Sequence, residues 1–194
     1  MHTIIRRTIT GLSLVAAVAI SSNLVVLAQE GVFLSEEQAP RAVFADADHF
    51  TRQVVTASSD MRERMKTILG ATEPSLWEKE YVTFTALRGE TVVGHAIIVE
   101  EIGKHRPITF VVGVRPDESV SDVAVMSYRE AYGGEVRNKR FLNQYRGKNA
   151  KSGLQTYTDI QNIAGATLSV DAASRAVKKA LAFAQVAFGN GAVS

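Results

Sequence analysis

The chain has 194 residues and a mass of 21.0 kDa, the size of one domain with a targeting segment. Hydrophobic residues make up 46% and charged residues 22%, which excludes a chain that is disordered throughout. The absence of cysteine excludes disulfides, thiol redox chemistry, thiolate-held iron–sulfur clusters and covalent c-type haem. The formal charge of +2 comes from Arg6 and Arg7, so the rest of the chain is neutral, which argues against nucleic-acid binding.

Residues 1–28 have the pattern of an export signal. Arg6 and Arg7 precede an uncharged apolar stretch that ends in Val26-Leu27-Ala28, which favours cleavage before Gln29. The stretch is also long enough to span a bilayer, so a retained anchor stays open, as does a buried N-terminal helix. With a signal or an anchor, the rest of the chain lies outside the cytoplasm. We therefore expect a periplasmic or otherwise extracytoplasmic protein.

Residues 29–79 are expected to form a mainly helical leader. Ser35 and Gln38 have the spacing of a capping box, which predicts that a helix begins there. Residues 49–57 resemble a short strand, and Ser59 is expected to cap a second helix. The leader would precede the main domain.

From residue 80 onward the periodicity predicts an antiparallel meander. Apolar residues recur in four segments joined by short turns, at residues 81–87, 91–102, 108–114 and 120–128. The second segment is apolar on both faces, which predicts a central strand covered by helices. Within it, the neighbouring carboxylates of Glu100 and Glu101 point to opposite faces, and we interpret them as a solvated edge.

The C-terminal part is expected to hold two helices. A short helix is predicted over residues 137–145, and residues 147–158 form a polar loop. From Val170 to Phe188 apolar residues step by three and four, which predicts an amphipathic helix with Thr167 or Ser169 as its N-cap. The predicted fold class is therefore α+β, an antiparallel sheet meander packed by helices, with a C-terminal amphipathic helix.

The motifs that are missing narrow the chemistry. The four histidines form no HxH or HExxH pattern, and the chain has no G-x-S-x-G, Walker loop or dinucleotide fingerprint. We assign no catalytic and no metal-binding residue. The remaining candidate is Gly165-Ala166-Thr167 before the last helix, where a helix N-terminus favours an anion such as phosphate. An ordinary N-cap after a tight turn would explain the same residues.

Gly165-Ala166-Thr167, followed by Ser169 and an amphipathic helix, resembles the FMN-binding domain family. Members include the periplasmic G subunit of Rnf complexes and the C subunit of the sodium-pumping NADH:quinone reductase. The blocks at residues 103–108, 128–136 and 141–148 resemble the family's core blocks. The resemblance covers residues 80–188, which we take as the FMN-binding domain.

The resemblance implies a role for each candidate residue. A dedicated flavin transferase would join FMN through its phosphate to Thr167, beside Gly165, Ala166 and Ser169. The loop that contains Glu130, Tyr132 and Gly133 would pass against the isoalloxazine ring, where glycine permits close contact. FMN is the expected cofactor.

The chain departs from the family motif at Gln161 and Ala164, where the family has Asp and Ser or Thr. Covalent FMN, non-covalent FMN and no flavin therefore stay open. The implied function is an exported electron carrier between redox partner proteins, with membrane-bound partners included. The alternatives are a flavin-dependent oxidoreductase acting on a small exported substrate, and a flavin-free binding or sensor module.

Overall fold

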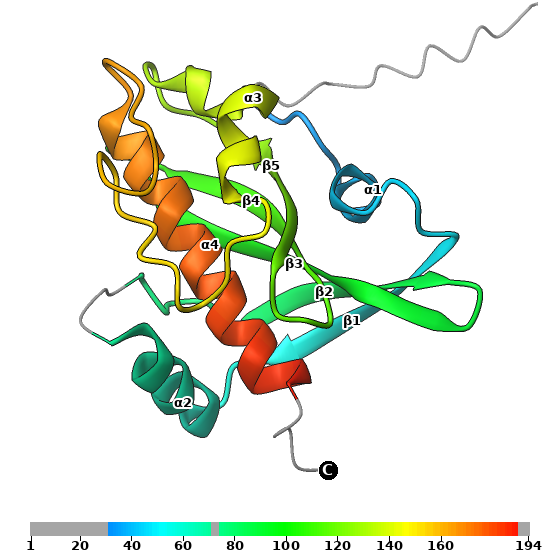
Figure 1. The fold of residues 1–194 in the computed structure, drawn as a ribbon. Helices are drawn as coiled ribbons and strands as arrows, with labels where there is room; N and C mark the ends of the chain where they lie inside the picture. The colour runs from blue at the N-terminus through cyan, green and yellow to red at the C-terminus, as the bar shows by residue number, and fades with distance from the viewer. Residues whose placement is uncertain (1–30, 71–73, 190–194) are drawn as a thin grey trace, which may run out of the picture.

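The computed structural model describes residues 31–70 and 74–189, which form an α+β fold on one antiparallel sheet (Figure 1). The strand order is β1-β2-β3-β4-β5, so each strand pairs with its neighbours in sequence. The strands are β1 (His49–Thr56), β2 (Glu80–Arg88), β3 (Thr91–Ile102), β4 (Pro107–Val114) and β5 (Val120–Ser127). The predicted fold class is confirmed, and β3 is the central strand that its apolar faces predicted.

Helices cover both faces of the sheet. They are α1 (Ala39–Val43), α2 (Ser59–Leu69), α3 (Lys139–Leu142) and α4 (Thr167–Phe188), with the short 3-10 turns η1 (Gly134–Arg137) and η2 (Asn143–Tyr145). Alternate residues of β3 face different cores, because side chains alternate along a strand. Ile97 packs in the core under α4, whereas Ala96 packs in the core with α1. Figure 1 shows α4 running across the sheet from its upper end to α2.

The segment before residue 80 contributes an edge strand to this same sheet. β1 pairs with β2 along its whole length, from His49 opposite Leu87 to Thr56 opposite Glu80. The strand predicted over residues 49–57 is confirmed, and it extends the predicted four-stranded meander to five strands.

Both helix starts predicted in the leader are shifted. The Ser35 amide donates to Gln38 Oε1 (3.0 Å) and the Gln38 amide donates to Ser35 Oγ (3.4 Å), so the capping box forms. It closes a turn before α1, however, and the N-cap of α1 is Gln38 and not Ser35. Helix α2 is capped by Ser58, whose Oγ accepts from the Met61 amide at 3.1 Å. The prediction of Ser59 as the cap was wrong, because Ser58 has the extended backbone (ψ 162°) that a cap needs.

The single helix predicted over residues 137–145 is instead a series of short turns. Asn138 ends η1 with an extended backbone (ψ 123°), and its Oδ1 accepts from the Arg140 amide at 2.9 Å to cap α3. An asparagine side chain that binds a nearby backbone amide competes with continuous helix, which explains the interruption.

Glu101 is the clearest correction to the sequence prediction. Its side chain is fully buried, with Oε1 2.9 Å from Lys179 Nζ and Oε2 3.1 Å from Arg175 Nε. Both cations belong to α4, which covers the face that Glu101 points to. The alternation rule was right that Glu100 points to the other face, where it accepts from Thr109 Oγ1 at 3.0 Å. The rule could not show that a buried lysine lies opposite Glu101.

No helix among residues 31–70 and 74–189 has the length and hydropathy needed to cross a bilayer. The signal or anchor predicted over residues 1–28 lies outside the described part of the chain.

Candidate functional site

Helix α4 begins at Thr167 without a capping side chain. Ala166 occupies the N-cap position, and the first turn holds no acidic residue. The amides of Ser169 and Val170 each donate to the Ala166 carbonyl at 2.9 Å. In the part of the chain that the structure describes, the amides of Thr167 and Leu168 have no acceptor. The positive end of this 22-residue helix is therefore uncompensated, which favours a bound anion.

The predictions of Thr167 or Ser169 as the N-cap were wrong, because both hydroxyls have other partners. Thr167 Oγ1 accepts from Nδ2 of Asn162 at 2.8 Å, and the same Nδ2 lies 2.7 Å from the Tyr157 hydroxyl. Since Thr167 Oγ1 accepts in this contact, its own proton remains available. Oδ1 of Asn162 is buried and has no hydrogen-bond partner within the described residues. The oxygen of Thr167 is thus held in place beside an unsatisfied polar atom.

Gly165 makes the turn that leads into α4. Its φ of +82° lies in the left-handed region, which strains any residue with a Cβ. A Cβ at this position would meet nothing within 4 Å among the described residues, whereas Ala166 is buried. Gly165 therefore sets the direction of the chain and leaves the approach to Thr167 open.

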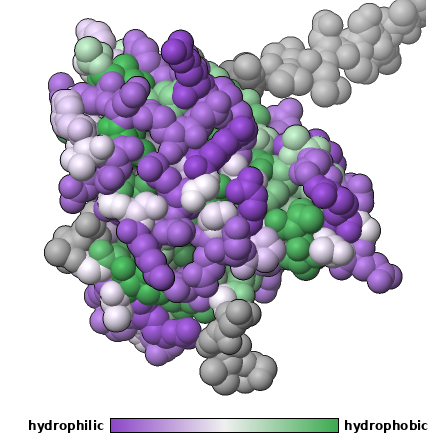
Figure 2. Space-filling view, viewed as in Figure 1, coloured by the Kyte–Doolittle hydropathy of each residue, from purple (hydrophilic) through white to green (hydrophobic). Residues whose placement is uncertain are grey.

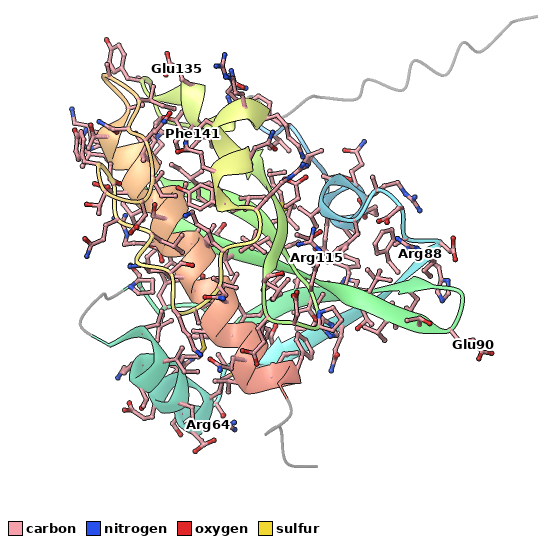
Figure 3. All side chains as sticks on the ribbon, in the orientation of Figure 1. Arg64, Arg88, Glu90, Arg115, Glu135 and Phe141 are labelled. Atoms are coloured by element: carbon pink, nitrogen blue, oxygen red, sulfur yellow. The ribbon has the colours of Figure 1, made fainter. Side chains whose placement is uncertain are left out.

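Gly133 lies directly against the first turn of α4. A Cβ on Gly133 would be 2.6 Å from Ser169 Oγ and 2.8 Å from the Tyr128 hydroxyl, and φ of Gly133 is +87°. The Tyr128 hydroxyl donates to the Tyr132 carbonyl, so it accepts from Ser169 Oγ at 2.9 Å. Burial raises the pKa of Tyr128, which keeps this hydroxyl protonated. Ser169 thereby fastens the loop to α4, and Figure 3 shows the adjoining η1 residue Glu135 near the start of that helix.

Glu130 holds the turn between β3 and β4. Its Oε1 accepts from the amides of His105 (2.5 Å) and Arg106 (2.9 Å). Burial raises the pKa of this carboxyl, but the backbone hydrogen bonds outweigh burial and lower it. The described contacts of the Glu130 carboxylate are therefore with the turn, and a contact with the ring stays a prediction.

Large apolar side chains are exposed around the start of α4. Tyr132 is 82% exposed, Tyr157 74% and Leu168 50%. Figure 2 shows hydrophobic surface among hydrophilic side chains at the upper left of the molecule, where α4 begins in the same view of Figure 1. Exposed aromatic and aliphatic groups beside an anion site suit a ligand with a flat aromatic ring and a phosphate.

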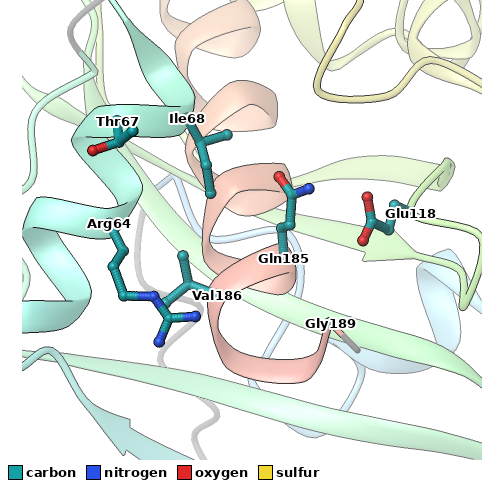
Figure 4. A pocket seen from close by; sticks show the side chains of 7 residues that line it. All are labelled: Arg64, Thr67, Ile68, Glu118, Gln185, Val186 and Gly189. Atoms are coloured by element: carbon teal, nitrogen blue, oxygen red, sulfur yellow. The ribbon is translucent and has the colours of Figure 1, made fainter. Parts of the chain in front are cut away.

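A hollow of about 470 Å³ runs along α4 from Tyr157 to Lys178 and includes Asp171 and Ser174. Another of about 470 Å³ lies near the end of α4, where Arg64 and Thr67 of α2 face Gln185 and Val186 (Figure 4). Thr167 and Val186 are separated by roughly 28 Å along the helix, at 1.5 Å per residue. The second hollow is therefore remote from Thr167, whereas the first is lined by Tyr157, whose hydroxyl contacts Asn162.

The comparison with protein families decides the identity of this region. The model of the FMN-binding domain matches residues 103–182, from the turn held by Glu130 through most of α4. Residues 103–182 belong to the FMN-binding domain family. The resemblance to this family is confirmed, and FMN is its cofactor. No curated protein matches the chain.

The residues of this FMN-binding domain fit the cofactor. Unpaired amides at Thr167 and Leu168 suit its phosphate, and the exposed side chains of Tyr132 and Tyr157 suit its ring. When bound, FMN supplies the redox chemistry, and the protein supplies its position and surroundings.

The structure brings most of the predicted site residues together. Gly165, Ala166 and Thr167 form the start of α4, and Gly133 and Ser169 touch across it. The sequence prediction missed Asn162, although it lies within the segment that leads to Thr167. Asn162 belongs to no recognised motif. Its role is seen only in the structure, where the turn before α4 brings its side chain to Thr167.

Replacing Gly133 with valine is expected to destabilise the FMN-binding domain and to alter the flavin spectrum, with the attached mass unchanged. The positive φ alone costs about 1–3 kcal/mol, and the new side chain also crowds Ser169 and Tyr128. Gly89→Val is the matched control, because Gly89 has φ of +57° and open space around a Cβ. Urea unfolding and absorbance spectra of both variants measure the difference. If both variants lose the same stability and Gly133→Val leaves the flavin spectrum unchanged, Gly133 is not part of the flavin site.

Proposed function

We propose that this flavin-binding protein is exported and carries one FMN, attached through its phosphate to Thr167, as an electron carrier. The uncapped start of α4 supports the attachment site most directly, since two free amides lie beside a threonine oxygen that Asn162 positions. The export signal predicted over residues 1–28 supports an extracytoplasmic location.

The attachment reaction transfers a phosphoryl group. Thr167 Oγ1 would act as the nucleophile toward the FMN phosphorus of an activated flavin donor, and the bond from that phosphorus to the donor's leaving group would break. The hydroxyl proton of Thr167 would pass to a base of the flavin transferase. Because Asn162 donates to Oγ1, the proton of that hydroxyl does not have to leave an internal hydrogen bond.

The departures from the family motif lie at the surface. Gln161 and Ala164 are both exposed. Their side chains are thus not needed for the core, and their replacement leaves the held oxygen of Thr167 intact. Asn162 supplies a polar contact to Thr167 where Ala164 has no hydroxyl. This arrangement supports covalent attachment despite the changed motif.

The surroundings of Thr167 favour an electron carrier over an enzyme that transforms a substrate. Two acidic groups of this region are engaged, since Glu130 binds backbone amides and Asp171 Oδ1 accepts from Thr156 Oγ1 at 2.5 Å. An oxidoreductase acting on a small molecule needs a positioned group that can exchange a proton with the substrate. The exposed side chains of Tyr132 and Leu168 leave the ring accessible to a protein partner.

Intact mass and colour test this function after export from a host that contains the flavin transferase. We expect a yellow protein with an FMN-sized mass increment that survives denaturation and is reversibly reduced. Colour that is lost on denaturation would show non-covalent FMN. A colourless protein of unmodified mass would favour the flavin-free binding or sensor module.

The mature chain is expected to begin at Gln29, because small and β-branched residues precede that position at the end of the apolar stretch. N-terminal sequencing of the exported protein measures this directly. An intact Met1 in the membrane fraction would instead establish a retained anchor.

A further inference from the structure

The neutral body of the chain divides into an acidic half and a basic half. Residues 29–102 contain 13 acidic and 7 basic residues, and residues 103–194 contain 7 acidic and 13 basic residues. Because the sheet is a meander, sequence position follows position across the sheet, from β1 at one edge to β5 at the other (Figure 1). The half that carries the FMN site is therefore the basic one.

Five basic side chains lie on the segments that adjoin the loop of Glu130 and Gly133, and we call them the basic face. They come from the turn before β4, from the residues just after β5 and from η1 and α3. They are Lys104, Arg106, Arg129, Arg137 and Arg140, all exposed. Within the described residues none of the five forms an ion pair. Their charge is therefore available to a partner.

The carboxylate of Glu130 connects two parts of the basic face. It binds the amides of the turn that carries Arg106, and it belongs to the loop that Ser169 fastens to α4. The turn and the loop are thus both connected to the first turn of α4, which begins at Thr167.

Exposed apolar side chains lie among these cations. Phe33 is 45% exposed and lies beside β5, since its amide donates to the Met126 carbonyl at 2.8 Å. The guanidinium carbon of Arg137 lies 4.1 Å from the centre of the Phe33 ring. Together with Tyr132 and Leu168, this gives the mixture of aromatic residues and arginine that is enriched at protein interfaces.

We propose that the basic face is the docking surface for a redox partner protein whose own surface is acidic. The inference rests on the proposed function, because an electron carrier has to bring its flavin close to the partner. Positive charge around Thr167 would steer an acidic surface toward the flavin, and the exposed aromatic groups would be desolvated on contact.

A titration with an octaglutamate peptide, followed by amide NMR of the exported protein, tests the basic face. We expect shifts confined to residues 104–106, 129–140 and 165–168. Binding should weaken about tenfold when salt rises from about 20 to about 200 mM, because exposed charges are screened. The double variant Arg106→Glu, Arg140→Glu should weaken binding by about tenfold or more.

The matched control is Arg64→Glu with Lys79→Glu, two exposed cations of the acidic half. Figure 3 shows Arg64 on α2, at the opposite end from Glu135. This pair should leave binding unchanged. Equal weakening by both pairs, or shifts spread over the surface, would overturn the proposal. Binding to vesicles of anionic lipid without binding of the peptide would assign the face to a membrane and would also overturn it.

The titration separates this proposal from the proposed function, because it needs no flavin. A colourless protein of unmodified mass that still binds the peptide here would refute the electron-carrier function and would still support an acidic partner. A protein that carries FMN but does not bind the peptide would support the electron-carrier function and would refute the docking surface.

Discussion

Thr167→Ala is expected to abolish the FMN-sized mass increment completely, whereas Ser169→Ala should retain it. The hydroxyl of Thr167 is at the first position of α4, beside two amides without acceptors, and it is the oxygen that Asn162 holds. Ser169 Oγ is buried and is used in the hydrogen bond to Tyr128. Intact mass of each variant, co-expressed with the flavin transferase, measures the outcome.

Ser169→Ala also serves as the control for folding. Loss of its hydrogen bond to Tyr128 should cost about 1 kcal/mol, because the Tyr128 hydroxyl keeps its acceptor at Tyr132. An increment that persists in Thr167→Ala would refute the assignment, and fragmentation would then have to locate the modified peptide. An increment lost in both variants would mean that the loop, and not one hydroxyl, controls attachment.

Lys179→Met is expected to lower the free energy of unfolding by about 3–5 kcal/mol, because it removes the buried cation that Glu78 and Glu101 share and leaves only Arg175 beside Glu101. Lys179 is fully buried, and its Nζ lies 2.8 Å from Glu78 Oε1 and 2.9 Å from Glu101 Oε1. The same Nζ lies 4.8 Å from the centre of the Trp77 ring. Urea unfolding of the parent protein and of Lys179→Met measures the difference in the free energy of unfolding.

Lys66→Met is the matched control for this change. Lys66 also forms an ion pair at 2.8 Å, with Glu63, but both side chains are more than half exposed. An exposed pair contributes about 0–1 kcal/mol, so this variant should remain close to the parent protein. Similar losses for both lysines would show that burial does not set the importance of Lys179.

Local patterns predicted the parts of the fold that depend on local sequence. The period of two predicted the strands, and the period near 3.6 predicted α4, whose Val170, Val177 and Leu181 are buried. Glu101 was placed wrongly because its surroundings depend on the helix that covers β3, and a strand pattern contains no information about that helix. Ser58 and Ser59 are chemically equal caps, and only the backbone at Ser58 decides between them.

Only the part of the candidate site that depends on local sequence was predicted. Gly165-Ala166-Thr167 could be found because a contiguous motif marks it. Asn162 and Tyr157 reach Thr167 through a loop in which Tyr157 has φ of +71°, a conformation that periodicity does not indicate. Tyr128 lies next to Ser169 only because the loop after β5 turns back to α4.

Helix α4 carries the proposed attachment residue, Thr167, at its first position and the buried Lys179 in its middle. The amides that would receive the phosphate are arranged only when this helix exists, and the ion pairs of Lys179 exist only when the helix is packed on the sheet. An unfolded chain therefore presents the sequence of the motif without its anion site. Maturation of this protein is thus expected to follow folding, so that only correctly folded chains receive the cofactor.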